Sequence, residues 1–115
     1  PGEHTRDFIY VKDVVKVNFY FWEHPEISGI FNCGTGHAHQ FNTLAKGVLK
    51  HFGSGELEYV PFPEVLKGKY QSFTQADTTN LLAAGYDGGF TPIEDAIAEY
   101  CALLDKTGGY YVYER

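Results

Sequence analysis

The sequence predicts an α/β fold in which short strands alternate with helices, and three observations lead to this prediction. Runs rich in β-branched and aromatic residues alternate with stretches whose apolar side chains recur every three to four positions. Glycine, proline and asparagine separate these runs. With 115 residues, of which 43% are hydrophobic, the chain also has enough apolar material for the packed core of one domain.

The first half of the chain predicts two strands, each followed by a helix. A strand is expected over 7–11, where β-favouring residues are consecutive, and Asp13 is expected to cap the helix that follows. A second short strand is expected over 29–33. Asn42 is then expected to cap an amphipathic helix, which Gly53 closes.

The second half predicts further strands over 56–60 and 70–74. Asp77 is expected to open a short helix that stops at Gly85. The Thr-Pro-Ile-Glu sequence at 91–94 predicts the start of the last helix, because it combines a capping box with proline at the first helical position.

Charge and hydropathy exclude two classes of partner. The net charge of −6 argues against a protein that coats nucleic acid, because binding through counterion release needs a basic face. A local positive patch for a small anionic ligand can still form from Arg6, Lys12, Lys67 and Lys69. No apolar run approaches the roughly 20 residues that a membrane-spanning helix needs, so no membrane partner is expected.

The cysteines and the first residue bear on where the protein acts and how much of it is present. Cys33 and Cys101 fall in a predicted strand and a predicted helix. We expect both to be small buried residues of a reducing compartment, with the cytoplasm as the default location. The chain starts with Pro1 and contains no methionine, so we expect it to be a piece of a larger protein.

The stretch over 61–86 says most about function. It places Lys67, Gly68 and Lys69 directly before a run of hydrogen-bonding side chains, which are Tyr70, Gln71, Thr74 and Gln75. Such a loop suits an anionic, polyhydroxylated ligand, because the charge attracts phosphate while the other groups bind sugar or base edges. The alternative is a surface loop whose lysines only keep the protein soluble.

Arg6 is a second candidate for binding an anion. It precedes the first predicted strand, and its planar fork binds a phosphate more selectively than a lysine does. The alternative is an ordinary ion pair with Asp7 or Glu3.

Other motifs are weak. Gly34-Thr-Gly36 follows a predicted strand, but a dinucleotide-binding fingerprint needs a third glycine where this chain has His39. Cys33, His37 and His39 do not complete the ligand set of a zinc site. The chain has no Gly-x-Ser-x-Gly elbow and no tyrosine followed by a lysine four positions later. We therefore predict no catalytic residue, no cofactor site and no metal site within this chain.

Three stretches of the chain together resemble the C-terminal part of extended short-chain dehydrogenase/reductases that modify nucleotide sugars. They are 6–15, 29–36 and 91–94. The stretch over 61–86 resembles a smaller group of proteins within that superfamily. It contains Pro-Phe-Pro, Lys-Gly-Lys-Tyr-Gln, Phe-Thr-Gln-Ala-Asp and Ala-Ala-Gly-Tyr in order, and it resembles the ADP-glyceromanno-heptose 6-epimerase family. The tail over 110–115 has no counterpart in that family.

The resemblance implies a division of labour in a longer parent protein. An N-terminal Rossmann domain outside this chain would bind NADP and carry the catalytic tyrosine–lysine pair. This chain, residues 1–115, would be the substrate-binding domain plus elements that pack on the Rossmann domain, among them the 29–33 strand and the helix before it. Alone it would be inactive, and any bare apolar faces would favour self-association.

The family reaction inverts C6″ of an ADP-linked heptose by oxidation and re-reduction on NADP, for the lipopolysaccharide core of bacteria. The resemblance thus implies an ADP-sugar substrate, a cytoplasmic isomerase and a homo-oligomer, in this family a pentamer. Arg6 matches the arginine that faces the ADP-sugar, and Tyr70 matches the tyrosine of the Gly-x-Tyr-Gln motif. Lys69 and Gln71, on either side of that tyrosine, are further substrate-loop candidates.

Two alternatives remain open. One alternative is a sibling enzyme, such as a UDP-glucose 4-epimerase or a dTDP-glucose dehydratase. These enzymes share the Arg6-Asp7-Phe8 element, so the 67–75 stretch has to distinguish the ADP-heptose epimerase family from them. A non-catalytic carbohydrate-binding module could also use this fold.

Overall fold

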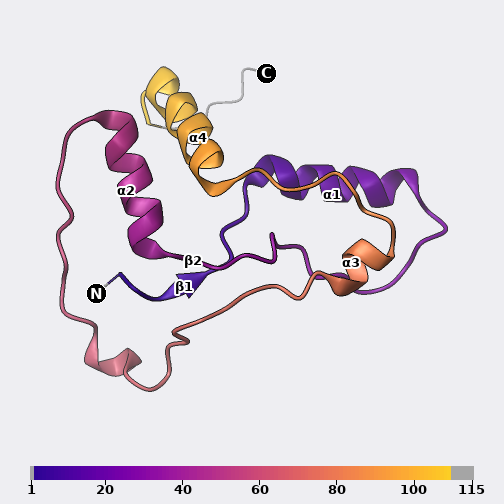
Figure 1. The fold of residues 1–115 in the computed structure, drawn as a ribbon, viewed down its shortest axis with the longest axis horizontal. Helices are drawn as coiled ribbons and strands as arrows, with labels where there is room; N and C mark the ends of the chain where they lie inside the picture. The colour runs from indigo at the N-terminus through magenta and orange to yellow at the C-terminus, as the bar shows by residue number, and fades with distance from the viewer. Residues whose placement is uncertain (1, 110–115) are drawn as a thin grey trace.

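The computed structural model describes residues 2–109. In chain order its elements are β1 (Thr5–Arg6), α1 (Val11–Glu23), β2 (His39–Gln40), α2 (Phe41–Phe52), the 3-10 turn η1 (Glu64–Leu66), α3 (Thr79–Ala83) and α4 (Ile93–Thr107). β1 and β2 pair antiparallel, with Thr5 opposite Gln40 and Arg6 opposite His39. Short strands and helices alternate from β1 to α2, and this mixed content confirms the α/β class. Figure 1 shows α2 beside α4 at one end of the molecule and α1 near α3 at the other.

Each end of the molecule is held together by its own small apolar cluster. One joins α1 to α3 and the segment after it, through Val17, Leu81 and Tyr86. The other consists of Ile93, Ile97 and Cys101 of α4, against which Leu44 and Val48 of α2 and Phe8 pack. The burial of Cys101 confirms the prediction for that residue.

Three strand predictions are wrong, because no strand forms over 7–11, 29–33 or 56–60. The 70–74 segment forms only a single bridge, in which Phe73 lies parallel to Thr5. Strand propensity describes how well a side chain fits a sheet surface, and a strand exists only where a neighbouring strand supplies hydrogen bonds. Among the described residues only β1 and β2 form such a pair.

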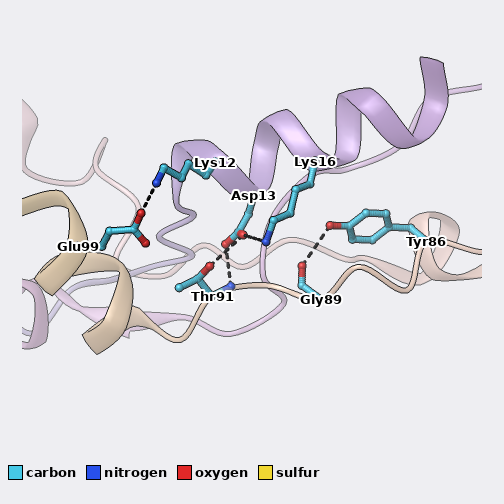
Figure 2. A network of polar contacts seen from close by, with 7 residues as sticks. All are labelled: Lys12, Asp13, Lys16, Tyr86, Gly89, Thr91 and Glu99. Carbon is cyan, nitrogen blue, oxygen red and sulfur yellow. Dashed lines mark hydrogen bonds and ion pairs between the residues drawn. The ribbon is translucent and has the colours of Figure 1, made fainter. Parts of the chain in front are cut away.

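Asp13 does not cap its helix. It lies in the first turn of α1, whose N-cap residue is Tyr10. Its fully buried carboxylate accepts hydrogen bonds from the Thr91 backbone N–H at 2.7 Å and the Thr91 hydroxyl at 3.0 Å (Figure 2). The Lys16 ammonium lies 3.3 Å from the same carboxylate. Asp13 therefore ties α1 to the residues that lead into α4.

The same contact explains why the predicted capping box is wrong. The hydroxyl of Thr91 is engaged by the buried carboxylate, and α4 begins at Ile93 with no side-chain hydrogen bond at its cap. Nor does Asn42 cap α2, which starts one residue earlier at Phe41. The end of α2 is as predicted, because Gly53 adopts a left-handed φ of 69° and closes the helix.

The short helix α3 starts after Asp77, as predicted. The Asp77 carboxylate accepts hydrogen bonds from the backbone N–H and the hydroxyl of Thr79, at 3.0 and 2.6 Å. These bonds satisfy donors at the first helical turn, and they lower the pKa of Asp77. The chain leaves the helix at Ala84 and turns at Gly85, where φ is 93°.

Much apolar surface stays exposed. Cys33 is exposed, so its predicted burial is wrong: the strand expected to bury it does not form. One side of α1 carries exposed apolar residues at spacings of four and three, namely Val11, Val15, Phe19 and Trp22. The Cα radius of gyration is 16.9 Å, whereas a compact domain of this length has about 13 Å. No helix within residues 2–109 combines the length and apolar character needed to cross a membrane.

Candidate functional site

The loop over 67–75, which contains Lys67 and Lys69, is held next to Arg6 by backbone hydrogen bonds to β1. The Thr5 N–H donates to the Ser72 carbonyl at 2.9 Å, and the Thr74 N–H donates to the Thr5 carbonyl at 3.2 Å. These two bonds place the 70–74 segment alongside the strand that carries Arg6. Residues more than 60 positions apart in the sequence therefore share one site.

The Arg6 guanidinium lies over the ring of Tyr70, with Cζ 4.7 Å from the ring centroid. It is also 6.0 Å from the centroid of the Phe41 ring. Nη2 donates to the Gln71 carbonyl at 2.5 Å and Nη1 to the Thr5 carbonyl at 2.7 Å. This cation–π and hydrogen-bond arrangement fixes the plane of the guanidinium.

Arg6 has no carboxylate partner among the described residues. The ion pairs within residues 2–109 join Lys12 to Glu99, Lys16 to Asp13 and Lys67 to Glu64. The alternative of an ion pair between Arg6 and Asp7 or Glu3 is therefore wrong. Since only two of its five N–H donors are bonded to carbonyls, the guanidinium keeps donors for an anion.

Tyr70 also belongs to an aromatic group with His4 and Phe62. The rings of His4 and Tyr70 stack at 5.2 Å, and Phe62 meets them edge-on at 5.8 and 5.4 Å. All three residues line an open cavity of about 690 Å³, which also borders the loop over 58–70, Phe41 and the start of the chain. Sequence reasoning missed His4 and Phe62, because neither belongs to a polar motif.

The other loop candidates lie in different settings. Lys69 is exposed and forms no ion pair with any described residue, whereas Lys67 pairs with Glu64. Gln71 contributes its backbone carbonyl to Arg6, and its side chain is exposed. The Gln75 side chain instead accepts a hydrogen bond from the Ala38 N–H at 3.3 Å, away from Arg6.

Asp7 positions the segments around the site, a role that sequence reasoning also missed. Its carboxylate accepts hydrogen bonds from the backbone N–H groups of Thr35 and Gly36, at 2.8 Å each, and of Ala76 at 3.1 Å. The Thr35 hydroxyl donates a fourth, at 2.5 Å. Burial raises the pKa of Asp7, but these four bonds outweigh it and leave the pKa lowered.

The Gly34-Thr-Gly36 turn therefore binds a carboxylate of the chain itself. A Cβ on Gly34 would lie 2.4 Å from the Ala76 Cβ and 2.8 Å from Asp7 Oδ2, so the turn needs glycine for close packing. Because its amides are already bonded, the turn does not fit the pyrophosphate of a dinucleotide. Residues 2–109 also hold no cluster of three or more residues able to bind a metal, so Cys33, His37 and His39 form no such site.

A second cavity, of about 510 Å³, is lined by residues in and after the Gly34–Gly36 turn and by the residues that lead into α4. Its lining includes His37, His39, Gln75 and Glu94. Among the described residues no arginine lies over a ring that lines this second cavity, whereas the Arg6 guanidinium lies over the Tyr70 ring of the first. The first cavity, beside Arg6, is the stronger candidate for the binding of an anionic ligand.

No protein-family model matches the chain. Among solved structures, its fold is similar to that of UDP-N-acetylglucosamine 4-epimerase from Methanobrevibacter ruminantium M1 in complex with UDP-N-acetylmuramic acid. The TM-score is 0.77 and the identity 22%, over 93% of this chain and 33% of the epimerase chain. The chain thus spans about a third of the length of that epimerase, and the likeness shows the fold alone.

Proposed function

We propose that the chain is the substrate-side segment of a nucleotide-sugar epimerase and that Arg6 and Tyr70 bind its substrate. The observation that carries the proposal is the Arg6 guanidinium held over the Tyr70 ring beside a cavity, with no carboxylate of residues 2–109 paired to it. A fixed guanidinium with spare donors suits a diphosphate, and the Tyr70 hydroxyl suits a sugar hydroxyl. The similar fold of a nucleotide-sugar epimerase supports this role.

Within that class we propose the ADP-glyceromanno-heptose 6-epimerase reaction of the lipopolysaccharide pathway. The support is the ordered set of motifs over 61–86, which includes the Gly-x-Tyr-Gln element around Tyr70. A UDP-sugar epimerase is the second candidate, because the similar solved structure is a UDP-N-acetylglucosamine 4-epimerase. The base attached to the diphosphate separates the two candidates.

We further propose that the chemistry lies in a separate NADP-binding Rossmann domain of a longer, oligomeric bacterial protein in the cytoplasm. The Gly34–Gly36 turn does not fit a dinucleotide, since the amides of Thr35 and Gly36 are bonded to Asp7. The exposed apolar side of α1, where Trp22 is 82% exposed, is the surface we assign to that domain. In this arrangement the present chain binds and orients the substrate.

Titration calorimetry of the 115-residue chain with ADP-heptose and UDP-N-acetylglucosamine tests the site. Arg6→Ala is expected to weaken binding of the preferred sugar roughly 10- to 100-fold, because a charge-assisted hydrogen bond contributes about 1.5–3 kcal/mol. Tyr70→Phe keeps the ring and removes the hydroxyl, so a loss of about fivefold is expected. Lys106→Ala, which removes an exposed cation of α4, is the matched control and should change little. Unchanged affinity in both site variants would refute the assignment.

A further inference from the structure

We infer that His4 is a positioning residue of the candidate site: its ring holds the ring of Tyr70 in place, and Tyr70 in turn holds the Arg6 guanidinium. The inference rests on the proposed function, because that proposal assigns substrate binding to Arg6 and Tyr70. It adds a residue that lies outside the 61–86 motifs and that acts through Tyr70, without touching the ligand.

The side chain of Tyr70 depends on the rings around it. Its backbone N–H donates to the Leu66 carbonyl at 3.1 Å, which fixes the main chain. Its hydroxyl has no hydrogen-bond partner within residues 2–109, and the residue is 39% exposed. A side chain anchored only at its backbone can adopt other rotamers unless its neighbours exclude them. The geometry at Arg6 therefore depends on what packs against the Tyr70 ring.

His4 makes the contact best suited to restrict that ring. The two rings stack with their centroids 5.2 Å apart and their planes only 23° apart. Phe62 instead meets Tyr70 edge-on, at 5.4 Å and 67°. A ring that lies face to face against Tyr70 blocks its rotation, whereas an edge contact covers less of its face. The His4 imidazole forms no hydrogen bond or ion pair with any described residue, so packing is what it contributes to the fold.

The backbone at His4 is also the firmer of the two supports. The His4 carbonyl accepts a hydrogen bond from the Phe41 N–H at 3.1 Å, directly before β1. Side chains two positions apart in an extended segment lie on the same face, so His4 and Arg6 both reach Tyr70.

Phe62 belongs to a segment with a much weaker hold on the rest of the chain. No backbone group over 54–62 forms a hydrogen bond with a described residue. Groups held on hydrogen-bonded elements are placed more precisely than groups on loops. We therefore assign the positioning role to His4 and not to Phe62.

The test is calorimetric titration of the full 115-residue chain with inorganic pyrophosphate. His4→Ala is expected to weaken binding about three- to tenfold, because the loss of one aromatic contact frees Tyr70 and with it the guanidinium. His4→Phe keeps a ring without the two nitrogens and should restore the affinity to within about twofold. In a Tyr70→Ala background, His4→Ala should add less than about a twofold loss, because residues that act as one unit are not additive.

His51→Ala is the matched control and should leave the affinity unchanged. His51 is a part-buried histidine whose ring meets that of Phe52 at 4.9 Å, outside the cavity lining. If His4→Phe fails to restore binding, or if His4→Ala costs as much without Tyr70 as with it, the imidazole acts directly and the positioning role is overturned. Unchanged affinity in His4→Ala beside a loss in Arg6→Ala also overturns it, while leaving the proposed function intact. Unchanged affinity in Arg6→Ala, or no binding of pyrophosphate at all, refutes the proposed function and the inference with it.

A second measurement needs no ligand. The Arg6 guanidinium lies over the Tyr70 ring, so the ring current of Tyr70 shifts the magnetic resonance signal of the Arg6 Nε–H group. His4→Ala is expected to move this signal toward its position in Tyr70→Ala, whereas His4→Phe and His51→Ala should leave it in place. A signal that His4→Ala does not move would overturn the positioning role.

Discussion

Asp13→Ala is expected to lower the free energy of unfolding by about 3 kcal/mol, measured by urea denaturation followed by circular dichroism. The substitution removes a fully buried carboxylate that accepts two hydrogen bonds from Thr91 and holds Lys16 (Figure 2). The backbone N–H of Thr91 would lose its partner, and an unsatisfied buried donor is costly. The link between α1 and the start of α4 would be lost.

The matched control is Asp87→Ala, which removes an exposed carboxylate without a hydrogen bond or ion pair to any described residue. It should change the free energy of unfolding by less than about 0.5 kcal/mol. Asp13→Asn keeps one acceptor oxygen and should fall between the two. A midpoint for Asp13→Ala that equals that of Asp87→Ala would contradict the structural role of Asp13.

Asp7→Ala is expected to have a comparable effect, about 3 kcal/mol, because four donors from 35–36 and 76 lose their common acceptor. The measurement is again urea denaturation at neutral pH. This carboxylate holds the Gly34–Gly36 turn against the segment that follows the substrate loop. If Asp7→Ala leaves the midpoint unchanged, the four hydrogen bonds do not stabilise the fold.

The lowered pKa of Asp7 also predicts how stability depends on pH. A group whose pKa is lower in the folded state stabilises the fold above its unfolded pKa, which is about 4 for aspartate. That contribution is lost as the pH falls below about 4 and the folded carboxyl takes up its proton. Asp7→Asn should therefore show a shallower loss of stability between about pH 5 and pH 3. A slope identical to that of the unsubstituted chain would contradict the assignment.

Some acid sensitivity should persist in Asp7→Asn. Hydrogen bonds from Thr79 lower the pKa of Asp77, and the hydrogen bond from Lys12 lowers the pKa of Glu99. Asp77 and Glu99 are exposed whereas Asp7 is part-buried, so their contributions to stability are smaller than that of Asp7. The comparison between Asp7→Asn and the unsubstituted chain isolates the contribution of the Asp7 carboxylate.

The helices could be predicted from the sequence because their signals are local. The apolar period of α2 and the left-handed Gly53 that ends it lie within one short stretch. The strands could not be predicted in this way. A run such as 29–33 forms a strand only beside a partner strand, and the sequence does not show where that partner lies. The cap predictions failed for a similar reason: Thr91 bonds to Asp13, which is 78 positions away.

The candidate site was predicted in part. The residue chemistry and the motif around Tyr70 indicated a phosphate-binding arginine and a sugar-binding phenol, and the structure places Arg6 over Tyr70. Their role in binding stays a prediction. The sequence did not reveal the clamp at Asp7, whose contact with Ala76 spans 69 positions. Nor did it reveal the aromatic cavity, because its rings come from the start of the chain, from α2 and from the loop over 58–70, which backbone hydrogen bonds bring together.

The most direct test of the central claim is to map the binding of ADP on the isotopically labelled chain by amide chemical-shift perturbation. The claim that the nucleotide binds beside Arg6 and Tyr70 predicts that the largest shifts fall at 4–6, 58–62 and 67–71. The second cavity, which includes 37–39 and 90–94, should stay unperturbed. Shifts concentrated at that second cavity, or no saturable shifts at Arg6 and Tyr70, would contradict the claim.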